Sequence, residues 1–261
     1  MMTITNTIET VVFILGCSCV VAGRAISAEP SACYTERSIL ADTGIPTVVQ
    51  PEQDCQLGVN IGWSSRYVTE GIDCLPGSSI WKIAPSIKYE GMIVSAWYAQ
   101  GVSESYKELD LVLGYAWQID GWTINPWYEH QFYLYQDYTV SNPALTISRT
   151  IDDWLEVGAE MQVKLEHKVG EAYYSVFCQT AWEVMEHVTV SPMLRYGYNG
   201  GYNPGVSDGS NCIDYSLGIN WQYAESCSLK VSLNYSQAVS SLRRVGLGDV
   251  FWIGLQCGFR F

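Results

Sequence analysis

Long hydrophobic runs are missing from this sequence. No window holds eighteen uninterrupted apolar residues, which is close to the length that a helix needs to cross a bilayer. Basic residues are also scarce, since 14 Lys and Arg stand against 27 Asp and Glu and give a formal net charge of −13. Nucleic-acid binding needs clustered Lys and Arg that neutralise phosphates. The composition therefore argues against a helical membrane span and against a nucleic-acid partner.

Signatures of metal or nucleophilic chemistry are missing as well. The three histidines are scattered, and no pair of cysteines has the spacing of zinc ligands. Neither G-x-S-x-G nor H-E-x-x-H occurs. Glu156 and Glu160 share one face of an expected strand, but a β-strand holds them roughly 13 Å apart, too far for a paired-carboxylate site. We expect no cofactor, no metal and no enzymatic activity, with a Ser-His or Asp-His site on a membrane barrel as the alternative.

Aromatic residues, in contrast, are abundant. The 18 Tyr and 10 Trp exceed what a soluble domain of this size needs. Tyr and Trp favour positions that are half apolar and half wet, such as the girdles at membrane interfaces. The aromatic content therefore favours a membrane protein, and a soluble, aromatic-rich β-sandwich is the alternative.

The C-terminal stretch alternates strictly between two kinds of side chain. Its odd positions are apolar from Phe251 to Phe261, and its even positions carry Trp252, Gly254, Gln256, Gly258 and Arg260. A period of two residues is typical of a β-strand with one apolar and one small or polar face. A terminal aromatic residue is typical of the last strand of bacterial outer-membrane barrels. We expect Phe261 to be recognised by the barrel assembly machinery.

The N-terminal residues predict export. Residues 11–22 form a short apolar run of signal-peptide length, so we expect residues 1–28 to be a signal peptide; a lipoprotein signal ending at Cys17 is the alternative. Residues 29–54 do not alternate and contain three prolines, so we expect a periplasmic leader before a barrel at residues 55–261.

Cysteine usage fits an exported chain. Seven cysteines remain after the signal peptide, an odd number that leaves at least one thiol unpaired in an oxidising compartment. Cys33 and Cys55 flank the proline-containing leader and could staple it, but the spacing does not determine the pairing.

The two-residue period recurs in eleven clear runs, separated by short turns that alternate with longer loops. Glu90–Gly91 and Asp120–Gly121 are expected two-residue hairpin turns. Chain ends on one side of the membrane require an even count, so we expect an all-β, transmembrane antiparallel up-and-down β-barrel of about twelve strands, with ten as the fallback. Residues 137–150 are expected to form a loop, and the missing hairpin is expected between residues 150 and 187.

Two local motifs resemble the TorF family of porin-like proteins. Residues 65–71, S-R-Y-V-T-E-G, at the end of the first expected strand, are similar to the S-x-Y-x-x-R-G opening of that family, and residues 83–97 resemble its next hairpin. The sharp likeness covers about residues 57–100 and implies an outer-membrane porin fold. Glu70 stands where the family has Arg, so no role of that Arg in the lumen carries over.

The polar faces of the expected strands are predicted to line a lumen in the bacterial outer membrane. The candidate lumen residues are the acids Glu108, Asp110, Glu129, Glu156, Glu160 and Asp214 and the bases Arg66, Lys82, Lys88, Arg195, Lys230 and Arg260. Their near balance fits either a salt-bridged filling or a narrow aqueous path.

These features predict a porin-like channel for passive passage of small polar solutes through the lipid bilayer. The alternative is a side-chain-filled barrel with a structural or surface-interaction role, displaying loops near residues 139–149 and 200–211.

Overall fold

The computed structural model describes residues 55–151, 154–165 and 171–261, and the predicted signal peptide and leader lie outside these ranges. The described chain is almost entirely β-structure, with one short helix, α3 (Ser240–Arg244). In this part of the chain, no helix is long and apolar enough to cross a membrane.

Twelve antiparallel strands form the wall, two of them interrupted by a single residue. In chain order they are β1 (Gln56–Ser64), β4 (Ile80–Tyr89), β5 (Met92–Gly101), β6 (Lys107–Tyr115) continued by β7 (Trp117–Ile119), β8 (Trp122–Tyr133), β9 (Tyr138–Ile151), β10 (Leu155–Val163), β11 (Ala172–Thr180) continued by β12 (Trp182–Met185), β13 (Val188–Gly200), β14 (Gly209–Ala224), β15 (Cys227–Ala238) and β16 (Val250–Arg260).

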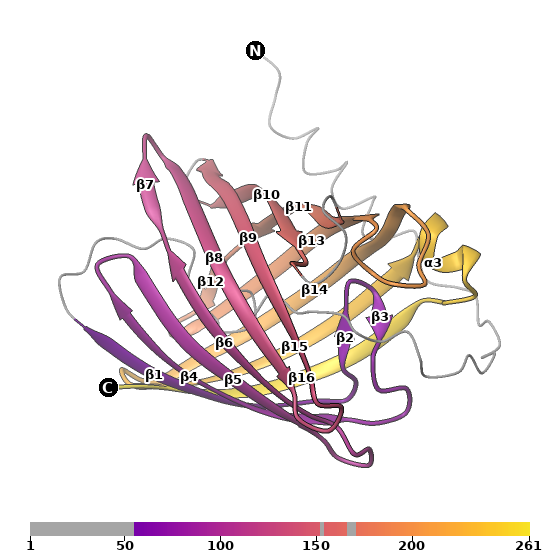
Figure 1. Ribbon diagram of the computed structural model, residues 1–261. Coiled ribbons are helices and arrows are strands. Elements are labelled where there is room, and N and C mark those ends of the chain that lie inside the picture. The colour runs from indigo at the N-terminus through magenta and orange to yellow at the C-terminus, as the bar shows by residue number, and fades with distance from the viewer. Residues whose placement is uncertain (1–54, 152–153, 166–170) are drawn as a thin grey trace.

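Pairing of the first and last strands closes the sheet into a barrel (Figure 1). Gly58 of β1 lies opposite Arg260 of β16, and the backbone N–H of Phe261 donates to the carbonyl of Leu57 at 2.9 Å. On the far side, β11 pairs with β13, so that the ladder is continuous. The predicted fold class is confirmed.

Short turns join the strands at one end of the barrel and longer segments join them at the other. Glu90–Gly91 and Asp120–Gly121 have positive φ at both positions, 46° and 84° in the first and 50° and 78° in the second. That is the conformation of a type I′ hairpin turn. The chain enters β1 and leaves β16 at this same end, which is the periplasmic end in barrels of this kind.

The outward face is an apolar band. Leu57, Trp81, Leu113, Val176 and Leu255 all keep between 44% and 56% of their side chains exposed. Each alternates along its strand with an inward neighbour, as the two-residue period predicts. Because the exposed positions are apolar around the whole wall, this surface suits hydrocarbon rather than water.

The predicted strand number is right, but the predicted place of the missing strand is wrong. Residues 138–151, expected to form a loop, are strand β9, and residues 155–185 supply only β10 and the interrupted β11–β12. Pro143 is tolerated in β9 because it lies one residue beyond the last pair with β10, Gln162 opposite Ala144. The loop expected near residues 139–149 is therefore part of the barrel wall.

The face assignment can be tested on β14 with two neighbouring residues. Leu217 lies opposite Leu233 near the middle of the strand, whereas Ser216 contributes to a cavity inside the barrel. We expect Leu217→Arg to destabilise the barrel by about 2–4 kcal/mol because it puts a charge near the bilayer midplane. Ser216→Arg should cost much less. Denaturant unfolding in lipid vesicles measures both, and equal losses would contradict the assignment.

Candidate functional site

The loop between β1 and β4 enters the barrel interior. It contains a small hairpin, β2 (Val68–Thr69) and β3 (Ile72–Asp73), whose tip is Glu70–Gly71 (Figure 1). The tip residues have φ of 44° and 80°, the same two-residue turn geometry as the periplasmic turns. We call residues 65–79 the inserted loop.

The inserted loop bridges opposite walls of the lumen. The Tyr67 hydroxyl donates to Glu108 of β6 at 2.8 Å, and the Asn211 amide of β14 donates to the backbone carbonyl of Glu70 at 2.5 Å. In the closed ladder, five strands separate β6 from β14 in either direction. The loop is thus tied to the barrel across its full width.

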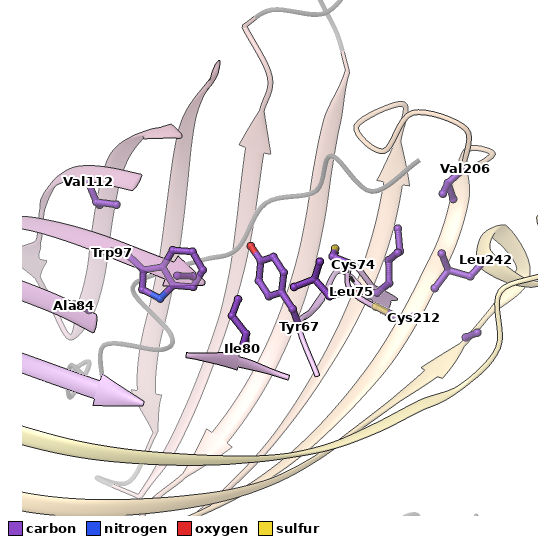
Figure 2. Packing of buried hydrophobic residues seen from close by; sticks show 13 residues of the cluster. Tyr67, Cys74, Leu75, Ile80, Ala84, Trp97, Val112, Val206, Cys212 and Leu242 are labelled. Carbon is purple, nitrogen blue, oxygen red and sulfur yellow. Dashed lines mark hydrogen bonds between the residues drawn. The ribbon is translucent and has the colours of Figure 1, made fainter. Parts of the chain in front are cut away.

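Apolar packing holds the inserted loop between these walls. Figure 2 shows Tyr67 and Leu75 lying between Trp97 on one wall and Cys212 and Leu242 on the other. The ring centroids of Tyr67 and Trp97 are 6.0 Å apart, and both side chains are almost completely buried. Burial of this cluster removes apolar surface from water and favours the docked position of the loop.

Gly71 is the point of closest approach. A methyl group in place of its hydrogen would come within 2.6 Å of the Cys212 Cβ, a distance that non-bonded carbon atoms do not reach. Only glycine therefore allows the tip to touch β14, and it also accommodates the positive φ.

Other contacts of the inserted loop join residues within the loop. Arg66 was predicted to line the lumen, but it follows the end of β1, and its guanidinium pairs with the Asp73 carboxylate at 2.5 Å while staying 43% exposed. Its role is to brace the hairpin, because the strand on which it was placed ends at Ser64. Cys74 forms a disulfide, whereas Cys55 carries a free thiol and so does not staple the leader.

A cavity of about 180 Å³ lies against the hairpin tip. Val68, Thr69, Glu70 and Gly71 form one side of it, and residues of β10, β11, β13–β16, β1 and β4 form the remainder. Five of the predicted lumen residues contribute to its wall: Lys82, Glu160, Arg195, Asp214 and Lys230.

Acidic side chains on the β6–β10 side are buried in hydrogen-bond networks. Glu108 accepts from the hydroxyls of Tyr67 and Tyr106, and Glu129 accepts from the Asn142 amide at 3.4 Å. Carboxylates withdrawn from water need such donors. Asp110, between them on the sheet, is likewise fully buried.

Further along the same side, β10 carries two more acids. Glu156 accepts from the Gln179 amide at 2.6 Å, and Glu160 accepts from Thr146 and Gln162 at 3.0 and 2.9 Å. Each carboxyl therefore accepts a hydrogen bond from its direct cross-strand neighbour, Gln179 for Glu156 and Thr146 for Glu160.

Basic side chains occupy the opposite side of the interior. The Lys82 chain lies across Gly62 of the neighbouring strand, and the Lys230 chain lies across Gly218. Lys88 shares the face of Lys82 on β4, and Arg260 shares the face of Gln256 at the periplasmic end of β16. Arg195 and Asp214 are direct cross-strand partners between the two regions.

One Ser-His pair occurs on the outward face. Ser141 and His130 are cross-strand neighbours on β9 and β8, and the Ser141 Oγ lies 2.9 Å from the His130 Nδ1. A nucleophilic serine must be reachable by its substrate, but Ser141 is only 8% exposed. The contact serves the pairing of the two strands.

Sequence reasoning missed the inserted loop, including Tyr67, Glu70 and Gly71. A local signal was present, because Val68-Thr69 and Ile72-Asp73 flank a Glu-Gly pair just as longer runs flank Glu90–Gly91. Nothing local indicates that this hairpin turns inward, since its partners are over a hundred residues away on β14.

Burial at the tip changes the protonation of Glu70. Removal from water raises its pKa from 4.5 to about 8. Asp214 adds to this effect, while the neighbouring Thr69 and the charges of Lys164 and Arg195 oppose it. Glu70 is therefore largely uncharged at neutral pH.

The closed twelve-strand barrel is similar in fold to solved outer-membrane porins. No family model matches this chain, and no curated protein matches it in sequence. Among solved structures, it is similar to the KdgM porin in complex with disordered oligogalacturonate, at a TM-score of 0.54 and 10% identity, covering 79% of this chain and 99% of that one. It is also similar to the NanC porin, at a TM-score of 0.54 and 12% identity, covering 78% of this chain and 98% of that one.

These likenesses concern the fold alone, because both identities are very low. Together with the apolar outer band, they indicate the bacterial outer membrane as the location of this chain. The TorF resemblance receives no support from a family or sequence match.

Docking of the inserted loop can be tested at Gly71. We expect Gly71→Ala to release the tip, because the new methyl group meets Cys212, and so to increase tryptic cleavage after Arg66 in the folded barrel. Gly77→Ala is a matched control, since Gly77 has nearly the same φ, 81°, but open space around it. Equal cleavage of the two variants would show that the contact with β14 does not hold the loop.

Docking should also weaken with rising pH. The docked tip raises the Glu70 pKa to about 8, whereas an undocked tip would titrate near 4.5. Docking is therefore strongest below pH 4.5 and weakens as the pH rises from 4.5 to about 8. Over this range Glu70 ionises more readily in the undocked state, so ionisation favours undocking. Cleavage after Arg66 should rise over this range relative to Glu70→Gln at the same pH. A constant ratio would contradict this coupling.

Proposed function

We propose that this protein is a non-enzymatic, porin-like channel for passive passage of small polar solutes across the outer membrane. The observation that carries the proposal is the cavity between the hairpin tip and the wall formed by β14, β15, β16, β1 and β4. Its lining is mostly polar, with Ser232, Asn234 and Gln256 among the contributing side chains. Membership of the TorF family is part of the same proposal and rests on residues 65–71 and 83–97.

Small inner side chains on this wall favour an aqueous path. Gly58, Gly254 and Gly258 face inward on β1 and β16, opposite Ser86, Ser232 and Ser228 of the adjacent strands. A twelve-stranded barrel is intermediate between small barrels filled by their side chains and wide porins. Glycine and serine leave the interior unfilled at these positions, whereas a barrel that served only as a scaffold would gain stability from larger side chains there.

The second candidate, a filled barrel with a structural or surface role, is favoured by a different observation. The inserted loop crosses the lumen and packs against both walls. If the loop stays docked, the remaining path is narrow. Both functions share the barrel, and they differ in whether ions and solutes cross it.

Single-channel recording in planar bilayers separates the two functions. We expect the wild-type protein to give unitary current steps, and Gly71→Ala to give larger or longer openings because the loop no longer narrows the path. Gly77→Ala should behave as wild type. Silence from protein that is folded, as judged by heat-modifiable gel mobility, in both wild type and Gly71→Ala would support the filled barrel.

A further inference from the structure

Charge is segregated across the barrel interior. Among the described residues, the inner faces of the four adjacent strands β15, β16, β1 and β4 carry bases and no acids. These bases are Lys82, Lys88, Lys230 and Arg260. The acids of β6, β8 and β10 stand on the opposite side, where hydrogen bonds and the inserted loop bury them. Lys82 and Lys230 of the basic side contribute to the cavity wall.

Two lysines are positioned on this side by glycines. A methyl group at Gly62 would come within 2.8 Å of the Lys82 Cε, and one at Gly218 within 3.3 Å of the Lys230 Cε. Each lysine chain thus lies flat over a neighbouring strand, and both contribute to the cavity wall. A chain held flat along the wall leaves the centre of the cavity for a ligand that its ammonium group can reach.

The carboxyl groups of the cavity wall are compensated by protein groups. Asp214 lies directly opposite Arg195. Glu160 accepts hydrogen bonds from Thr146 and Gln162, and Glu70 is mostly protonated at neutral pH because of its burial. Lys82, Lys230 and Arg195 contribute cationic side chains to the same wall.

We propose that the cavity is a binding site for small hydroxylated organic anions, with Lys82 and Lys230 contacting the carboxylate and Gln256, Asn234 and Ser232 contacting hydroxyl groups. This proposal deepens the proposed channel function and rests on it for its physiological meaning. A volume of about 180 Å³ is below the range of pockets for drug-sized ligands, so the site suits a single small solute. Lysine provides a mobile point charge with three donors, which fits a carboxylate that passes through.

The test uses gluconate, a hydroxylated carboxylate, and sorbitol, its uncharged counterpart. In planar bilayers under a KCl gradient, we expect the wild-type reversal potential to indicate anion preference and gluconate to interrupt the current at concentrations where sorbitol does not. Lys82→Gln and Lys230→Gln should each weaken gluconate block by about tenfold, since each removes a charged hydrogen-bond donor. The double variant should lose most of the anion preference.

Lys107→Gln is the control, because Lys107 faces outward and stacks over the Tyr135 ring at 5.6 Å. It should leave selectivity and block unchanged. Current steps without anion preference, or gluconate block unaffected in the double variant, would overturn the anion site while leaving the channel intact.

Absence of current steps would instead count against the channel. Calorimetric titration of gluconate into the folded, detergent-solubilised barrel would then decide the site separately. Binding that is weakened in the double variant supports the site, and absence of wild-type binding overturns it.

Discussion

Closure of the hydrogen-bond ladder is the constraint on which the rest of the structure depends. In hydrocarbon, each unpaired backbone N–H or C=O costs several kcal/mol, so a sheet can cross the membrane only if it has no edges. The pairing of β1 with β16, completed by the bond from Phe261 to Leu57, removes both edges. It also sets the register, because a slip of one residue would turn every inner side chain toward lipid. The strict alternation of the last strand reflects this requirement.

The period of two made much of the wall predictable, and local turn chemistry made its periplasmic turns predictable. Asp120–Gly121 needs no distant partner to form a tight turn. Strand β9 was missed because Asn142-Pro143 and several Ser and Thr residues resemble a loop. Pro143 is acceptable in β9 because it lies one residue beyond the last pair with β10. The end of that pairing cannot be read from the sequence of β9 alone.

The interior was less predictable because its contacts join residues far apart in the chain. Alternation identifies which side chains face inward, but it does not say what lies opposite. Tyr67 meets Glu108, and Gly71 meets Cys212, only after twelve strands have closed around the inserted loop. The equal numbers of candidate lumen acids and bases in the sequence likewise gave no indication of where these charges lie in the barrel. Acids and bases in near-equal number suggest mutual pairing, whereas the fold places most of them on opposite sides.

The residue at the hairpin tip ties these observations together. Glu70 stands where the resembling family has Arg, and it lies in a cavity whose wall already contains Lys82, Arg195 and Lys230. A further arginine there would be repelled by these cations and would strengthen the positive potential of the cavity. A carboxyl avoids that repulsion, and its burial keeps it largely neutral, so it does not cancel the basic wall. A largely neutral carboxyl at the tip therefore avoids repulsion from the cations that it faces. Since a single turn residue bears on both loop docking and cavity charge, a charged replacement there should alter access and selectivity together.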